Sequence, residues 1–143
     1  MPKTKDGKPT GQSRETERPE EPLDGRSKAF FCAQEAIRFK AVDLVLLDVA
    51  AFSSFADYFI ICSGKSSRQV QGLADNLETS LRDYGIKPLG VEGVREGQWI
   101  LMDYGDVIVH IFYEPVRQFY DLESLWSEAS KLRVEEKAET TDG

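Results

Sequence analysis

Two apolar segments joined by a very short connection constrain the fold more than any other feature of this chain. Residues 98–103 and 106–113 each have the length and apolar content of a β-strand, and only Tyr104-Gly105 lies between them. A two-residue connection that contains glycine is typical of a β-hairpin. The sequence therefore predicts two antiparallel strands in which Asp103 faces Asp106.

This register divides the hairpin into two faces, because successive side chains of a strand point to opposite sides of a sheet. One face is aliphatic and is predicted to be core; it pairs Ile100 with Val109 and Met102 with Val107, beside Ile111. The other face pairs Trp99 with His110 and Leu101 with Ile108, beside Phe112. Such a mixture of aromatic and polar groups is enriched at protein interfaces. The alternative, which composition favours, is that helices bury both faces.

The remaining segments predict one α/β (α+β) domain. Apolar residues recur at helical spacing in three segments, residues 27–40, 66–84 and 116–129. Ser66 and Gln69 form the capping box of the second helix, and Gly85 supplies its left-handed stop. Three further segments have the composition of strands, residues 42–49, 57–62 and 87–92. This order predicts a single domain with a mixed five-stranded sheet and flanking helices.

The two ends of the chain differ from its middle. We predict a disordered arm for residues 1–25, because Leu23 is its single large aliphatic residue. Residues 133–143 are predicted to form a charged tail, which leaves residues 26–132 for the domain. The N-terminus lacks the apolar region of a signal peptide, and no apolar run approaches the roughly 20 residues of a membrane span. The expected location is therefore the cytoplasm.

The net charge of −7 is unevenly distributed along the chain. Residues 1–26 hold six basic and six acidic residues, whereas the remainder holds 12 basic and 19 acidic residues. An acidic domain binds bare nucleic acid poorly, because such binding depends on neutralising phosphates with Lys and Arg. The charge suits a basic protein partner instead.

No catalytic or metal-binding motif is complete in this sequence. Gly64-Lys65-Ser66 matches the end of a phosphate-binding loop, but Phe59 occupies the position of the required second glycine. Cys32 and Cys62 lie 30 positions apart without a C-x-x-C motif, so we predict buried, free thiols. Nucleotidyl transfer needs carboxylates clustered around magnesium, whereas the candidate acids here are scattered: Asp48, Asp57 and Asp75.

His110 is the only histidine of the chain, which argues against a zinc site. The sequence places no serine or cysteine beside it as a nucleophile. We therefore interpret His110 as a structural residue packed beside Trp99, with catalysis as the alternative.

Several segments of the domain, in their order along the chain, carry a resemblance to a known protein family. The first half contains Lys40-Ala41-Val42-Asp43, Leu47-Asp48-Val49 and residues 56–70. The second half contains Glu92-Gly93 and residues 99–111 and 117–126. Over about residues 27–129 the chain thereby resembles the ribosomal silencing factor (Iojap-like) family.

The resemblance implies a nucleotidyltransferase-like fold without enzymatic activity and without a cofactor. It also implies binding to protein fourteen of the large ribosomal subunit, at the surface where the small subunit docks. Such binding would block subunit joining and repress translation. Family members also form homodimers, so a homodimer is expected here.

The resemblance carries over to five partner-binding residues. Trp99 and Tyr104 match family positions implicated in the ribosome contact, and Asp103, Asp106 and His110 lie in the same segment. Tyr104, placed at the tip of the predicted hairpin, is expected to be available to a partner. Two alternatives remain open: a nucleotide-binding or nucleotidyl-transferring enzyme of the same fold, and a structural homodimer without a ribosome contact.

Overall fold

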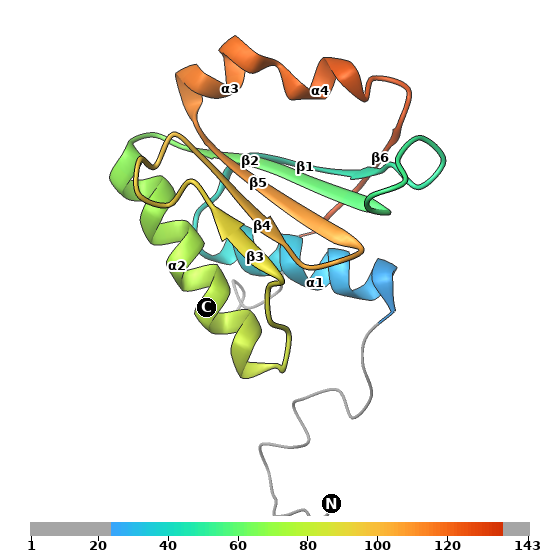
Figure 1. The fold of residues 1–143 in the computed structure, drawn as a ribbon, viewed down its shortest axis with the longest axis horizontal. Helices are drawn as coiled ribbons and strands as arrows, with labels where there is room; N and C mark the ends of the chain where they lie inside the picture. Colours follow the sequence, from blue (N-terminus) through green and yellow to red (C-terminus); the bar gives the residue numbers. More distant parts are fainter. Residues whose placement is uncertain (1–23, 136–143) are drawn as a thin grey trace, which may run out of the picture.

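A mixed sheet of six strands lies at the centre of the computed structural model, which describes residues 24–135 (Figure 1). The strands are β1 (Val42–Asp48), β2 (Tyr58–Gly64), β3 (Gly90–Glu92), β4 (Trp99–Asp103), β5 (Val107–Tyr113) and β6 (Ser130–Leu132). Their order across the sheet is β3-β4-β5-β2-β1-β6. Strands β2 and β5 pair in parallel, and every other pair within these residues is antiparallel. The predicted mixed sheet is confirmed, with six strands in place of five.

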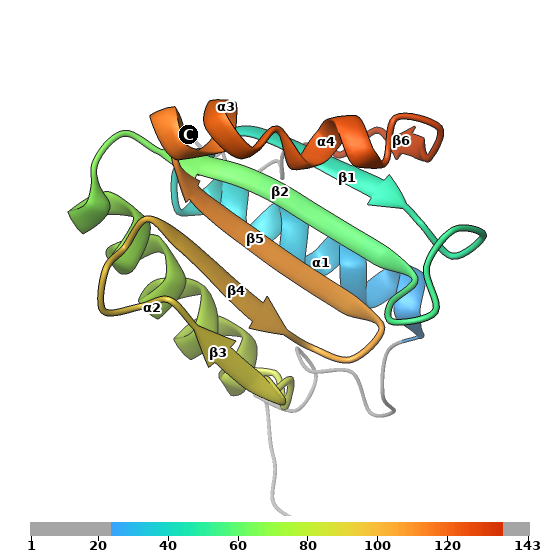
Figure 2. The same ribbon diagram turned by 45° about the horizontal axis from the view of Figure 1, so that its top comes forward.

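Helices cover both faces of this sheet. Helices α1 (Gly25–Arg38) and α2 (Ser67–Asp83) pack on one face, and α3 (Glu114–Tyr120) and α4 (Leu122–Leu125) lie over the other (Figures 1 and 2). The face toward α1 and α2 holds the larger core, which includes Leu46, Ile60, Leu77, Ile100, Met102, Val109 and Ile111. The aliphatic face of the hairpin is therefore core, as predicted.

Helix α2 begins as its sequence predicts. The Ser66 hydroxyl accepts a hydrogen bond from the Gln69 amide nitrogen at 3.0 Å. The Gln69 side chain in turn accepts from the backbone nitrogen of Lys65 at 2.6 Å, so the two residues together satisfy backbone donors at the start of the helix. After the helix, Gly85 has φ +81°, the left-handed conformation that favours glycine.

The turn of the β4–β5 hairpin lies one residue later than predicted. Tyr104 donates its backbone N–H to the Val107 carbonyl at 2.8 Å, so the two turn residues are Gly105 and Asp106. Gly105 has φ +92°, which suits the first central position of a type II′ turn. Asp103 consequently lies opposite Ile108, and the predicted pairing with Asp106 is wrong.

The other predicted pairs of this hairpin shift with the turn. Trp99 lies opposite Phe112, Ile100 opposite Ile111, Leu101 opposite His110 and Met102 opposite Val109. The shift amounts to two residues of one strand, and side chains alternate with a period of two. Each side chain therefore keeps the face that the sequence predicted for it, although its partner is different.

The closing segment is not the single helix that the sequence predicts. Asp121 adopts a left-handed conformation with φ +48°, which separates α3 from α4. After α4 the chain forms β6, in which Leu132 pairs with Leu46 and Lys131 with Leu47. This short edge strand is the sixth strand that the sequence did not indicate.

The described structure includes the inner ends of both predicted end segments, residues 24–25 and 133–135. Asp24 accepts a hydrogen bond from Ser27 N at 2.7 Å and caps α1, although the arm was predicted to run to residue 25. Val134, from the predicted tail, packs against the core beside α1 and α2. Residues 1–23 and 136–143 lie outside the described part of the chain.

Candidate partner-binding surface

The face of the sheet toward α3 and α4 is covered over only part of its area. Beneath these helices lie the fully buried side chains of Val49, Ile61 and Phe112. Val116, Leu122 and Trp126 of the covering segment pack against them. Burial, the alternative that composition favoured, is therefore correct for this part of the face.

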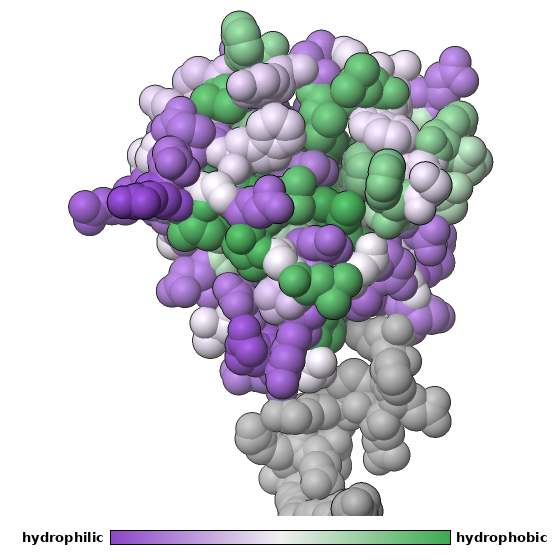
Figure 3. Space-filling view, in the orientation of Figure 1, coloured by the Kyte–Doolittle hydropathy of each residue, from purple (hydrophilic) through white to green (hydrophobic). Residues whose placement is uncertain are grey.

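The remainder of this face stays partly open along β4 and β5. Trp99, Leu101 and Ile108 are half-buried there, with no helix over them fully enclosing their side chains. Phe119 and Tyr120 of α3 extend the open area, with 80% and 54% of their surface exposed. In the space-filling view, hydrophobic side chains gather where Figure 1 shows the strands between α2 and α3–α4 (Figure 3). We use the name aromatic surface for these half-buried and exposed side chains of β4, β5 and α3: Trp99, Leu101, Ile108, Phe119 and Tyr120.

A groove lies beside Trp99 at one end of the aromatic surface. Its volume is about 460 Å³, and its lining comprises Gln98, Trp99, Tyr113, Pro115, Val116, Phe119 and Tyr120. The Tyr120 ring centroid lies 5.1 Å from that of Trp99 and 5.0 Å from that of Phe119. Exposed aromatic rings around a groove are the arrangement that partner proteins use as an anchor site.

His110 fixes the orientation of Trp99. The indole Nε1–H of Trp99 donates a hydrogen bond to His110 Nδ1 at 3.1 Å. The indole also packs against Phe112, with ring centroids 4.7 Å apart. His110 thus acts as a positioning residue for the aromatic surface, which agrees with the structural role predicted for it.

The environment of His110 does not suit a catalytic base. The side chain is 5% exposed, and burial lowers the pKa of His110 to about 4, so the ring is neutral near pH 7. Its Nδ1 accepts from Trp99, and its buried Nε2 has no hydrogen-bond partner among the described residues. His110 Nε2 is therefore enclosed in this structure.

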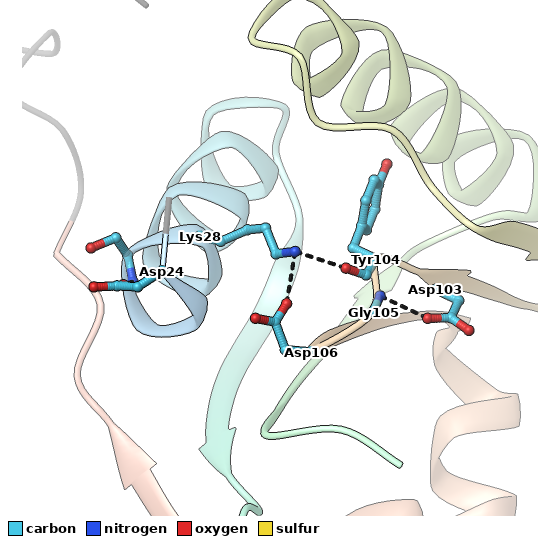
Figure 4. A network of polar contacts seen from close by, with 7 residues as sticks. Asp24, Lys28, Asp103, Tyr104, Gly105 and Asp106 are labelled. Carbon is cyan, nitrogen blue, oxygen red and sulfur yellow. Dashed lines mark hydrogen bonds and ion pairs between the residues drawn. The ribbon is translucent and has the colours of Figure 1, made fainter. Parts of the chain in front are cut away.

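Asp106 and Lys28 join the hairpin turn to α1 (Figure 4). The Lys28 ammonium lies 2.7 Å from Asp106 Oδ1 and donates to the Tyr104 carbonyl oxygen at 2.8 Å. Asp103 Oδ1 accepts from the backbone nitrogen of Gly105 at 2.8 Å, across the same turn. Both aspartates thus stabilise the turn from within this chain.

Tyr104 lies on the opposite face of the sheet from Trp99. Its side chain is 3% exposed within the core toward α1 and α2, and this burial raises the pKa of the Tyr104 phenol. The phenolic oxygen has no hydrogen-bond partner in the described part of the chain. The expectation that Tyr104 is available at a hairpin tip is wrong, because the turn begins at Gly105 and leaves Tyr104 at a core-facing strand position.

The five predicted residues therefore occupy three places. Trp99 belongs to the aromatic surface and is hydrogen-bonded to the buried His110, Asp103 and Asp106 lie at the turn, and Tyr104 is core. The sequence analysis did not single out the exposed part of α3, because Phe119 is one of the apolar residues at helical spacing in residues 116–129.

Arg117 is a further residue that the sequence did not single out. Its Nη1 donates to Ser63 Oγ at 2.8 Å, and its Nε and Nη2 each bond a carboxylate oxygen of Glu123 at 3.0 Å. These bonds tie α3 to β2 and to α4. Arg117 thereby positions the helix that carries Phe119 and Tyr120.

The described residues give no support for a metal site, a reactive thiol or a membrane-spanning helix. Within residues 24–135, no group of three His, Cys, Asp or Glu side chains is placed to hold a metal ion. Cys32 and Cys62 are buried free thiols, as predicted, and burial raises the pKa of each to about 12. No helix in this part of the chain has the length and apolar character to cross a membrane.

Comparison with known proteins identifies the family. Residues 22–143 match the family model described as "Ribosomal silencing factor during starvation". The Bacillus subtilis ribosomal silencing factor is 42% identical over 90 residues, which are 63% of this chain and 76% of that protein. The Haemophilus influenzae ribosomal silencing factor is 46% identical over 88 residues, 62% of this chain and 86% of that protein.

A solved structure shares the fold as well. The crystal structure of a Chromobacterium violaceum protein superimposes with a TM-score of 0.71 and 31% sequence identity. The match covers 81% of this chain and 96% of that one. Sequence and fold thus agree, and this chain belongs to the ribosomal silencing factor family.

Proposed function

We propose that this protein binds protein fourteen of the large ribosomal subunit and thereby blocks association with the small subunit, which represses translation in the cytoplasm. Membership of the ribosomal silencing factor family supports a ribosomal partner. The observation that carries the rest is the aromatic surface, where Trp99 is half-buried and held in one orientation by His110.

The aromatic surface has the properties of a binding anchor. Trp and Tyr are enriched among the residues that dominate binding energy, and rigid side chains lose less entropy when a partner docks. Trp99 is fixed by a hydrogen bond and by ring contacts, while Phe119 and Tyr120 extend into solvent. The chain is acidic, with a net charge of −7, which steers a basic partner toward it.

The five predicted residues take different parts in this proposal. Trp99 makes the contact, and His110 orients it. Asp103 and Asp106 hold the hairpin turn, and Tyr104 anchors the same hairpin in the core. A second copy of the chain is the other partner that we propose for the aromatic surface, so homodimer formation and ribosome binding would compete.

We further propose that the protein acts by binding and not by catalysis. His110 is enclosed and neutral, and the described residues offer no carboxylate cluster for magnesium. A nucleotide-dependent enzyme of this fold is the alternative. Equilibrium dialysis with ATP and magnesium separates the two, because a binding protein of this kind retains neither.

The order in which components are mixed tests the mechanism. Purified large subunits are incubated with the protein before small subunits are added, and the yield of joined ribosomes is measured on a sucrose gradient. We expect a strong reduction in this order and a much smaller one when the protein is added to preformed ribosomes. Equal inhibition in both orders would contradict steric blocking.

A further inference from the structure

Two phenylalanines that are not part of the aromatic surface are exposed on the loop between β1 and β2. Phe52 is 52% exposed and Phe55 is 85% exposed. Neither ring contributes to the two buried cores. Large apolar side chains that a fold leaves in solvent, when they lie together, mark interaction sites.

Hydrogen bonds hold both halves of the loop that carries these rings. Its first part is closed by the Val49 carbonyl, which accepts from Phe52 N and Ser53 N at 2.9 Å each. Its second part is closed by Ser53 Oγ, which accepts from the backbone nitrogen of Phe55 at 3.0 Å. A rigid loop loses little conformational entropy when a partner docks on it.

The loop is attached to the β4–β5 turn. The Asp106 carbonyl accepts from Asp57 N at 2.9 Å and from Tyr58 N at 3.0 Å. On the other side of the turn, Leu89 donates its backbone N–H to the Asp103 carbonyl at 2.6 Å and is 77% exposed. Exposed apolar side chains therefore flank the turn on both sides.

Carboxylates lie among these apolar groups. Asp57 is exposed, and Asp48 and Asp103 are half-buried. Within residues 24–135, none of the three forms an ion pair with a lysine or arginine, whereas Asp106 is paired with Lys28. We call Phe52, Phe55, Asp57, Leu89 and Asp103 the sheet-end surface.

We propose that the sheet-end surface is a second contact with the large ribosomal subunit, and that it receives a protein segment presenting apolar side chains between lysines or arginines. This inference rests on the proposed function and adds a separate site to it. Carboxylates that form no ion pair within residues 24–135 favour basic side chains and repel the phosphates of RNA, so the partner at this site is protein.

Two other occupants fit the charge less well. A second copy of this chain, docked through the same surface, would place the unpaired carboxylates of the two copies against one another. The chain's own residues 1–23 contain five basic and five acidic residues and one large aliphatic residue, Leu23. That segment has no net positive charge and offers the two phenylalanines only one large aliphatic side chain.

The test measures the affinity of full-length variants for purified large subunits by co-sedimentation at several salt concentrations. Phe55→Ser should raise the dissociation constant at least ten-fold with an unchanged melting temperature, because the ring lies in solvent. Val94→Ser is the matched control, since Val94 is 45% exposed and belongs to neither surface. It should bind like the wild type.

The charge of the site is tested independently with Asp57→Lys. We expect weaker binding and a smaller dependence of the dissociation constant on salt. Stronger binding by this variant would indicate RNA phosphates at the site and overturn the proposal, as would wild-type affinity of a folded Phe55→Ser protein. If the wild type itself does not bind large subunits, the proposed function fails; if only Trp99→Ala loses affinity, the proposed function stands and this inference fails.

Discussion

Lys28 and Asp106 connect the first turn of α1 to the turn of the β4–β5 hairpin, with 2.7 Å between Nζ and Oδ1 (Figure 4). The helix approaches so closely that a Cβ on Gly25 would lie 2.7 Å from Asp106 Oδ2. The lysine therefore ties the turn to the helix.

Replacing Lys28 with Met should lower the free energy of unfolding by about 1–2 kcal/mol, because a half-buried carboxylate and the Tyr104 carbonyl both lose a charged donor. Urea denaturation measures the change. Arg82→Ala, which removes an exposed ion pair with Glu78, is the matched control and should change stability by less than about 0.5 kcal/mol. Equal effects would show that Lys28 contributes no more than a surface charge.

Tyr104 should behave as a core residue. Tyr104→Ala is expected to destabilise the fold by about 3–4 kcal/mol, since it leaves a cavity between the sheet and the helices. Tyr104→Phe should be neutral or slightly stabilising, because the buried hydroxyl has no hydrogen-bond partner among the described residues. Thermal and urea unfolding measure both. A loss of more than about 1 kcal/mol in Tyr104→Phe would reveal a hydroxyl partner.

His110 should make stability depend on pH. Its pKa is lowered from 6.5 to about 4 in the folded protein, so between these values the unfolded chain binds a proton that the folded chain does not. The free energy of unfolding should therefore fall as the pH drops from about 6.5 to about 4, by up to about 3 kcal/mol. The measurement is urea denaturation across this range.

The control for this pH dependence is His110→Gln. Because His110 is the only histidine, the carboxylates titrate alike in both proteins, and the difference between them isolates the imidazole. The two curves should separate by a constant amount above pH 7 and converge toward pH 4. Parallel curves throughout would mean that the pKa of His110 is the same in the folded and the unfolded chain.

Trp99→Ala should weaken binding to large subunits by about 2 kcal/mol or more, as truncation of an interface aromatic anchor typically does. Some stability should be lost too, because Trp99 also packs on Phe112. Leu125→Ser, at an exposed position of α4 outside the aromatic surface, should bind normally. Sedimentation with separated subunits measures both. Similar affinities of the two variants would remove the aromatic surface from the ribosome contact.

In the hairpin, sequence periodicity predicts the face on which each side chain lies but not the position of the turn. The alternation of side chains assigns Trp99 and His110 to one face and Ile100 to the other, and the structure agrees. A two-residue turn with glycine as its first or as its second residue fits the sequence equally well, and the contacts of Lys28 with the turn come from a helix that is remote in sequence. The side chain of Tyr104 was misplaced for that reason.

The prediction of a single helix for the closing segment, residues 116–129, was wrong for a local reason. Its apolar residues fit one helix, but Asp121 turns left-handed and its carboxylate accepts from the Ser124 hydroxyl. Aspartate is one of the few residues besides glycine that adopt this conformation readily, because its short polar side chain can form local hydrogen bonds. That break leaves Phe119 in solvent, which no hydrophobic pattern predicts.

Both outermost strands of the sheet, β3 and β6, are only three residues long. Long, flat edges are templates on which other chains add strands and polymerise, and very short edges suppress this. A protein that displays several aromatic rings to solvent is exposed to that hazard. The short edges therefore leave little exposed strand backbone on which another chain could add a strand.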